Sequence, residues 1–260
     1  MRIALGIEYD GSDFSGWQAQ VGCKTVQGLL EAALSKVAAE PIAVFCAGRT
    51  DAGVHASGQV VHFDTQAARV LKAWVFGTNT LLPPSISVRW AVVVDDAFHA
   101  RFSAVARRYR YVIYNQPVRS ALLVRRASLH FQPLDVTRMQ NAANYLLGEH
   151  DFSSLRSSRC ESKTPMRTVH EITVLRQGDL VSFEIEANAF LHHMVRNIAG
   201  LLMRVGAGFA EPEWIGEVIA AKDRRAAAET ATPNGLYLMQ VRYKAPYEFP
   251  PVLSMSALIG

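Results

Sequence analysis

The chain has 260 residues, of which half are hydrophobic and 19% are charged, a composition typical of a folded globular protein with one large domain or two smaller ones. No stretch approaches eighteen consecutive apolar residues and no signal-peptide pattern opens the chain, so we expect no membrane association. Three widely spaced cysteines without a Cys-x-x-Cys pair argue against a disulfide framework and a structural zinc site, and they indicate a reducing cytoplasm.

The first part of the chain predicts the order β-α-β-β. Alternating apolar residues indicate a strand from Ile3 to Tyr9, followed by a glycine-rich turn. Apolar residues at helical spacing begin at Val26, with Thr25 as the expected N-cap. Two further strands are expected at Ile42 to Phe45 and at Gly58 to Phe63.

The second part mixes hairpin-forming strands with helices. Its strand-like runs are Ile86 to Val94, Tyr109 to Tyr114, Val169 to Leu175, Leu180 to Ala187 and Leu236 to Tyr243. A first helix is expected to begin after its N-cap Asp135 and to be ended by Gly148. Two further helices are expected at Phe190 to Val205 and at Trp214 to Ala221. This mixture predicts an α+β architecture rather than a regular βαβ winding.

The run from Cys46 to His55 is the most informative local feature. It places Arg49, Asp51 and His55 around two glycines, between two expected strands. Glycines allow tight turns and close approach of a ligand to the backbone, and loops on a rigid scaffold commonly carry catalytic groups. Asp51 is therefore a candidate catalytic carboxylate. The alternative is an aspartate that caps a turn.

The distribution of charge is less ordinary than the net charge of +4. From Ala97 to Leu134 there is no Asp or Glu, whereas seven arginines and three tyrosines occur there. A second basic stretch contains Arg156, Arg159, Lys163 and Arg167, opposed only by Glu161. Basic residues interleaved with aromatic ones favour a polyanionic partner, RNA or DNA first. The alternative is a set of solvated surface arginines.

Five stretches in order carry a resemblance to a known family. They are Tyr9-Asp10-Gly11 through Gly16-Trp17-Gln18, Gly48 through His55, Asn79 with Leu82-Pro83, Phe98 through Ala104 running into Arg108-Tyr109-Arg110-Tyr111, and Asn188 through Asn197. Over nearly its whole length the chain resembles the tRNA pseudouridine synthase A (TruA) family.

The resemblance implies a pseudouridine synthase fold, in which two related α+β subdomains share a mixed central β-sheet with a catalytic cleft between them. We expect the subdomains at residues 1–100 and 101–260. It also implies a homodimer that binds tRNA, with no DNA or membrane partner and neither a metal nor an organic cofactor. The implied reaction converts uridine to pseudouridine in the anticodon stem-loop, at tRNA positions 38, 39 and 40.

The resemblance also assigns roles to three residues. Asp51 would act as nucleophile or base at the ribose, and the sequence does not choose between these roles. Arg196 would orient Asp51 and keep it ionised. Tyr109 would stack on the target uracil, and its hydroxyl is a candidate for taking the C5 proton. The alternative for Tyr109 is a core tyrosine.

The remaining predicted site residues would contact RNA. They are Arg49, His55, Arg101, Arg107, Arg108, Arg110, Arg156 and Arg167, some of which we expect to pair with acids of the same fold. Two other functions compete with an isomerase. One is a non-catalytic RNA-binding module. The other is a hydrolase or nuclease using Asp51 with His55, against which the sequence shows no second carboxylate or histidine cluster for a metal.

Overall fold

The computed structural model describes residues 1–158 and 160–251 and divides them into two compact units. Unit 1 contains Met1–Val105 and the described residues from Tyr237 onward, and unit 2 contains Ala106–Leu236. Arg159 of the second basic stretch and residues 252–260 lie outside the described residues. Both units combine strands with helices, and their strand pairs are parallel as well as antiparallel, so the predicted α+β class is confirmed.

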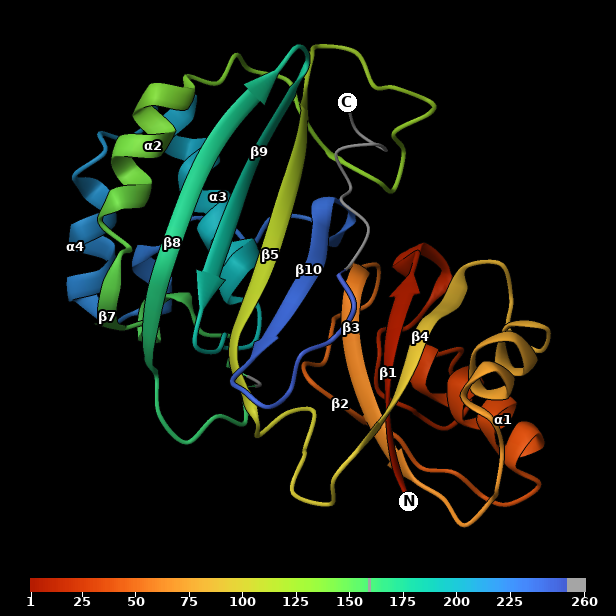
Figure 1. The fold of residues 1–260 in the computed structure, drawn as a ribbon. Helices are drawn as coiled ribbons and strands as arrows, with labels where there is room; N and C mark the ends of the chain where they lie inside the picture. The colour runs from red at the N-terminus through yellow and green to blue at the C-terminus, as the bar shows by residue number, and fades with distance from the viewer. Residues whose placement is uncertain (159, 252–260) are drawn as a thin grey trace. The chain divides into compact units, whose positions relative to one another are not determined.

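Unit 1 is built on a sheet with the strand order β4-β1-β3-β10 (Figure 1). β1 (Arg2–Tyr9) lies between β3 (His55–Asp64) and β4 (Ile86–Val94) and is antiparallel to both. The last strand, β10 (Leu236–Tyr243), pairs with β3 in parallel. A short strand, β2 (Phe45–Cys46), pairs with β3 near the C-terminal end of β3. Both ends of the described chain therefore contribute to one sheet.

Unit 1 also contains a 3-10 turn at Gly11–Asp13 and two longer helical segments. α1 (Val26–Ala38) begins where predicted, and the Thr25 side chain accepts a hydrogen bond from the backbone N–H of Gly28 at 3.3 Å, as expected for its N-cap. A segment at residues 71–79, π-helical over Ala73–Gly77, packs beside α1. It buries Trp74 against Phe63, with ring centroids 5.1 Å apart. The sequence pattern did not predict this segment.

Of the strand predicted at Ile42 to Phe45, only Phe45 lies in a strand, β2, and hydrogen bonds explain why the residues before it do not. The backbone N–H of Ile42 donates to the Ser35 hydroxyl at 2.9 Å, and that of Val44 donates to a Glu31 carboxylate oxygen at 2.9 Å. Side chains of α1 therefore take the donors that a sheet ladder would use. Ile42 and Val44 are buried, which produces the strand-like alternation without a strand.

Unit 2 contains the sheet order β5-β9-β8-β7. These strands are β5 (Ala104–Asn115), which begins at the junction of the units, β9 (Leu180–Ala187), β8 (Met166–Gln177) and β7 (Gly148–Asp151). Adjacent pairs are antiparallel, and a short strand, β6 (Ser128–His130), runs parallel to β5. The predicted strands are confirmed here, and β5 and β8 are longer than predicted.

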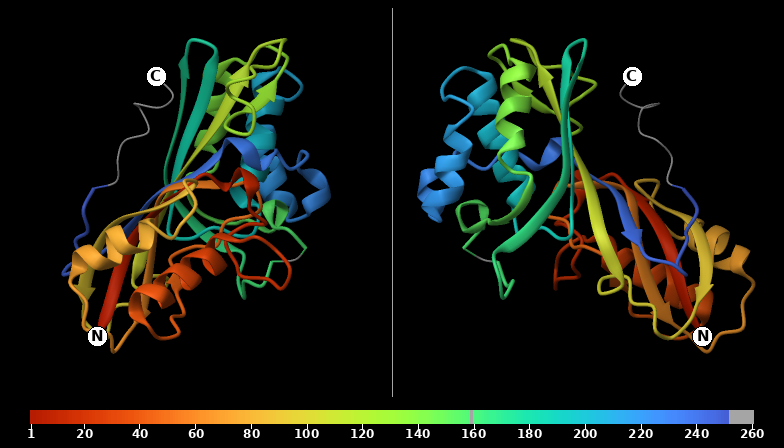
Figure 2. Two further views of the ribbon diagram at one scale, coloured as in Figure 1. Left: turned by 90° about the vertical axis from the view of Figure 1, so that its right-hand side faces the viewer. Right: turned by 60° about the vertical axis from the view of Figure 1, so that its left-hand side comes forward.

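Three helices, α2 (Val136–Asn144), α3 (Met194–Gly206) and α4 (Trp214–Ala221), cover one face of this sheet (Figure 1, Figure 2). The Asp135 side chain caps α2, as predicted, by accepting from two backbone N–H groups. α3 begins later than its predicted start at Phe190, because His193 has a φ of 66°, which interrupts a right-handed helix. Within residues 1–158 and 160–251, no helix combines the length and apolar character needed to cross a membrane.

Candidate active site

Residues 47–54, which we call the Asp51 loop, connect β2 to β3 in unit 1. Within it Arg49 is exposed and Asp51 is half-buried, whereas Thr50 between them is 8% exposed. The buried threonine therefore acts as the anchor, and the two charged residues on either side of it are carried at the surface of the unit.

The N-terminal motif holds Thr50 in place. The backbone N–H of Trp17 donates to the Thr50 carbonyl at 3.0 Å, and the Tyr9 and Thr50 hydroxyls lie 2.8 Å apart. A Cβ on Gly16, whose φ is +90°, would lie 2.9 Å from the Thr50 carbonyl oxygen. The glycine is required by this close approach, which the local sequence pattern does not predict.

The other end of the Asp51 loop is fixed by His55 and Gly11. The backbone N–H of Gly11 donates to His55 Nδ1 at 3.1 Å, and the imidazole stacks on Tyr237 of β10 with centroids 4.6 Å apart. A Cβ on Gly11 would lie 1.9 Å from the Val54 carbonyl oxygen. His55 is 3% exposed, so its observed task is to hold the loop.

Tyr109 and Tyr111 point to the same face of β5 but have different surroundings. Tyr111 is fully buried, and its hydroxyl donates to the Thr232 carbonyl at 2.8 Å and lies 2.6 Å from the Ser128 hydroxyl. Burial raises the pKa of Tyr111. Tyr109 is 8% exposed and meets the edge of Phe190 at 5.0 Å. Both rings pack against a second aromatic side chain, since Tyr111 also stacks on Phe183 at 5.7 Å. They differ in that Tyr111 is fully buried with a bonded hydroxyl, whereas Tyr109 keeps a small exposed area.

Arg196 lies in the first turn of α3, between buried residues. Its Nε donates to the Ala231 carbonyl at 2.8 Å, and the Ala231 N–H donates back to the Arg196 carbonyl at 3.1 Å. The half-buried guanidinium is therefore fixed at its Nε by the backbone of a segment distant in sequence.

The arginines of β5 pair with acidic residues of the same unit. Arg108 contacts Glu171 at 2.6 Å, Glu186 at 3.2 Å and Glu184 at 3.4 Å. Both Nε and Nη2 of Arg110 donate to Glu184, at 2.8 and 2.5 Å. The nearby Arg107 is buried and donates to the Asn188 carbonyl at 3.0 Å. These three predicted RNA contacts are engaged in the structure of unit 2.

Arg156 and Arg167 donate hydrogen bonds to the segment at residues 160–164. Arg156 donates to the carbonyls of Cys160 and Ser162, at 2.7 and 2.8 Å. Arg167 is 8% exposed and donates to the Ser162 hydroxyl at 2.6 Å, and burial lowers its pKa. By contrast, the predicted RNA contact Arg101 in unit 1 is exposed.

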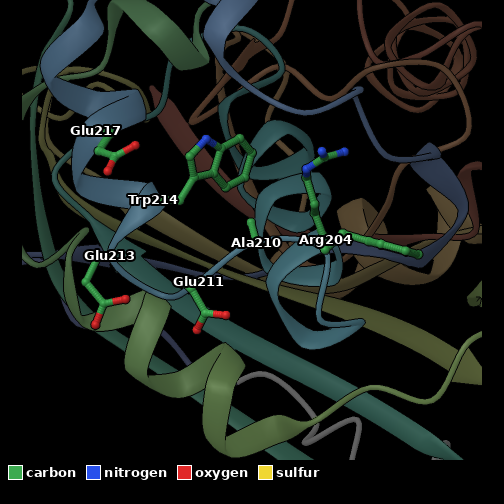
Figure 3. A pocket seen from close by; sticks show the side chains of 7 residues that line it. Arg204, Ala210, Glu211, Glu213, Trp214 and Glu217 are labelled. Carbon is green, nitrogen blue, oxygen red and sulfur yellow. The ribbon is translucent and has the colours of Figure 1, made fainter.

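A hollow of about 360 Å³ in unit 2 lies where the chain passes from α3 to α4 (Figure 3). The Arg204 guanidinium carbon is 5.5 Å from the centroid of the Trp214 ring. The other lining residues are Phe209, Ala210, Glu211, Glu213 and Glu217. The hollow contains no predicted site residue, and its three carboxylates disfavour a polyanion.

Comparison with known proteins identifies the family. The model of the tRNA pseudouridine synthase family matches residues 6–103 and 142–244. Proteins named tRNA pseudouridine synthase A from Pseudomonas aeruginosa and Shewanella woodyi are each 58% identical to this chain over 250 residues. Each alignment covers 96% of this chain, together with 88% of the Pseudomonas protein and 96% of the Shewanella protein. The protein of that name from Nitrosococcus oceani is 56% identical, with 96% of each chain covered.

Among solved structures, a chain of a Cbf5-Nop10-Gar1 complex matches 91% of this chain and 48% of its own length. Its TM-score of 0.37 and 12% identity are too low to add to the sequence comparisons. The sequence relatives cover nearly all of this chain and match it at more than half of the aligned positions. The chain therefore belongs to the tRNA pseudouridine synthase family and is an isomerase that acts on uridine in tRNA.

Proposed function

We propose that this isomerase forms pseudouridine in the anticodon stem-loop, at tRNA positions 38, 39 and 40, with Asp51 as its catalytic carboxylate. The observation that carries the proposal is the Asp51 loop. It holds a half-buried carboxylate on a backbone fixed through Thr50 and His55. We further propose a cytoplasmic homodimer that works without a metal or organic cofactor.

The reaction explains why one carboxylate suffices. Pseudouridine formation breaks the bond between uracil N1 and ribose C1′, rotates the base and joins C5 to C1′. The C5 proton is lost and N1 gains a proton, so the product is an isomer of the substrate. No net oxidation occurs. Asp51 acts at the ribose as nucleophile or base, and a fixed loop supports either role because it limits the motion of the attacking oxygen.

Tyr109 is proposed to hold the uracil while the base is detached. Extruding a base costs a few kcal/mol, and an aromatic platform returns about 1–3 kcal/mol per stacked base. The edge contact with Phe190 supports this role because it restricts the ring. We assign removal of the C5 proton to the Tyr109 hydroxyl.

Arg196 is proposed to orient the Asp51 carboxylate, as the family resemblance implies. A guanidinium bonded at Nε to a backbone carbonyl has restricted rotation and keeps a planar set of donors. Such a cation would favour the ionised form of a neighbouring carboxyl group. Of the predicted RNA contacts, Arg49 and Arg101 receive support from their exposure.

Single-site substrates test the proposed target positions. Three tRNA transcripts would each carry one uridine among positions 38, 39 and 40, and a fourth would carry none. We expect the wild-type enzyme to form pseudouridine in the first three, detected by carbodiimide modification and primer extension, and not in the fourth. Modification confined to another part of the tRNA would contradict the proposed target. Light scattering of the free enzyme tests the homodimer.

A further inference from the structure

Unit 1 carries a row of aromatic rings that reaches the surface at both ends. Phe45 is 52% exposed and Phe102 is 76% exposed. Phe45 stacks on His62 with centroids 5.1 Å apart, and Phe102 lies 4.3 Å from His99. The two histidines are 4.6 Å apart and complete the row. We call these four residues the aromatic row.

The histidines form a fixed, uncharged base for the exposed rings. His62 Nδ1 accepts from the backbone N–H of Ala100 at 3.1 Å, and His99 Nδ1 accepts from those of Arg101 and Phe102 at 3.1 and 3.3 Å. Burial lowers the pKa of His62 to about 4 and also lowers the pKa of His99. The two histidines are therefore held in place and uncharged at neutral pH, and they give the exposed rings an ordered base on which a flat ligand can stack.

Cations flank the aromatic row. The Arg101 guanidinium carbon lies 5.7 Å from the centroid of the Phe102 ring. Arg101 directly precedes Phe102 in the chain, and Arg49 follows Phe45 by four residues. Arg49 belongs to the Asp51 loop, which begins directly after β2.

We infer that Phe45 and Phe102 form a stacking site for an unpaired nucleobase of tRNA, with Arg101 bound to the adjoining phosphate. Exposed rings beside arginines are the combination by which proteins bind single-stranded nucleic acid. This site deepens the proposed function and rests on it. Because β2, which carries Phe45, leads directly into the Asp51 loop, we expect the bound base to be a neighbour of the target uridine.

Substitutions at Phe102 test the site through the dissociation constant of an unmodified tRNA transcript at fixed salt. Phe102→Ala should weaken binding about 5- to 100-fold, the range expected for one lost stacking contact, and Phe102→Trp should retain it. Phe76→Ala is the matched control, because Phe76 is 66% exposed in the same unit and lies outside the row. Its affinity should equal that of the wild type.

Two further measurements separate stacking from charge. Phe102→Ala should leave the slope of log affinity against log salt unchanged, whereas Arg101→Gln should reduce it by about 0.7–0.9, the value of one phosphate contact. A 2-aminopurine placed in the anticodon loop should be quenched on binding to the wild type and less so on binding to Phe102→Ala.

Three outcomes would overturn the inference. If the wild type binds and isomerises tRNA, and Phe102→Ala binds it equally well, the stacking site is wrong while the proposed function stands. If Phe102→Ala keeps its tRNA affinity but changes the oligomeric state in light scattering, the row is a protein contact. If the wild type neither binds nor isomerises tRNA, the proposed function and the stacking site both fail.

Discussion

The Asp51 loop and strand β5 both carry arginines, but the two regions use them differently. In β5, Arg108 lies opposite Glu186 and Arg110 lies opposite Glu184, so the strand register gives each cation an acid. In the Asp51 loop, the backbone is held by its neighbours and the Arg49 side chain is exposed. Basic composition therefore indicates a polyanion, but the strand register decides which arginines of β5 are paired with acids of the same sheet.

The difference is also one of energetics. Cross-strand pairs of opposite charge contribute roughly 0.2–1 kcal/mol each, so the β5 arginines stabilise the sheet of unit 2. In the Asp51 loop, the contacts instead fix the backbone that carries Arg49 and Asp51. We expect substitutions of the paired arginines Arg108 and Arg110 to change the free energy of unfolding, and substitutions of the charged loop residues to change tRNA binding or turnover.

The largest expected effect concerns Tyr109, the residue of β5 assigned to catalysis. Tyr109→Phe keeps the ring but loses the proposed proton acceptor, so turnover should fall about 10²- to 10⁴-fold with unchanged tRNA affinity. Tyr111→Phe is the control. It removes a buried hydroxyl that donates to the Thr232 carbonyl and lies beside the buried Ser128 hydroxyl, so it should cost about 1–3 kcal/mol of stability in urea unfolding. Near-normal turnover of Tyr109→Phe would reject the hydroxyl as the proton acceptor.

Gly11→Ala tests the attachment of the Asp51 loop. The added Cβ would overlap the Val54 carbonyl, so the free energy of unfolding should fall by about 3 kcal/mol or more. Gly77→Ala is the control in the same unit, because its Cβ would meet only a Val37 methyl at 3.4 Å. Equal melting temperatures of the two variants would show that the loop does not need this close approach.

Acid should weaken unit 1 through His62. Its folded pKa of about 4 lies below the value of about 6.5 for an unfolded histidine, so the unfolded state binds the proton more readily. The contribution of neutral His62 to the free energy of unfolding is present above pH 6.5 and is lost as the pH falls toward 4. Between pH 7 and pH 5 the free energy of unfolding should fall by about 2 kcal/mol. His62→Asn keeps an acceptor for Ala100 and should flatten urea-unfolding stability across this range. An unchanged pH dependence would show that His62 is not responsible.

The smallest effect compares single arginines of the two regions. Arg49→Gln should reduce the salt slope of tRNA binding by about 0.7–0.9, as expected for one lost phosphate contact. Arg110→Gln should leave that slope unchanged and lower stability by up to about 1 kcal/mol, because it loses its pair with Glu184. Equal salt slopes for the two variants would remove the distinction between the regions.

Local sequence patterns predicted the elements whose signals are themselves local. α4 and β10 have the predicted bounds, and the side chains of Thr25 and Asp135 cap helices as expected. The predictions failed where contacts between residues distant in sequence determine the secondary structure. Side chains of α1 take the backbone donors of Ile42 and Val44, which suppresses a strand there.

The same distinction holds for the candidate site. The glycines and charged residues around Asp51 identified the loop from sequence, since their spacing is local. The pairing of Arg110 with Glu184 joins residues 74 positions apart, and no local pattern predicts it. The meeting of Phe45 with His62 and of His62 with His99 likewise depends on β2 pairing with β3 and on the turn that follows β4.

Tritium release from a tRNA transcript labelled at uridine C5 tests most directly whether the isomerisation depends on Asp51. Wild type, Asp51→Asn and the exposed control Asp96→Asn would be compared without added metal, with tRNA affinity measured in parallel. We predict release by the wild type and the control, and loss of at least about 10²-fold in Asp51→Asn at unchanged affinity. Near-normal release by Asp51→Asn would show that Asp51 is not the catalytic carboxylate. Tight tRNA binding with no release by any of the three proteins would indicate an RNA-binding module.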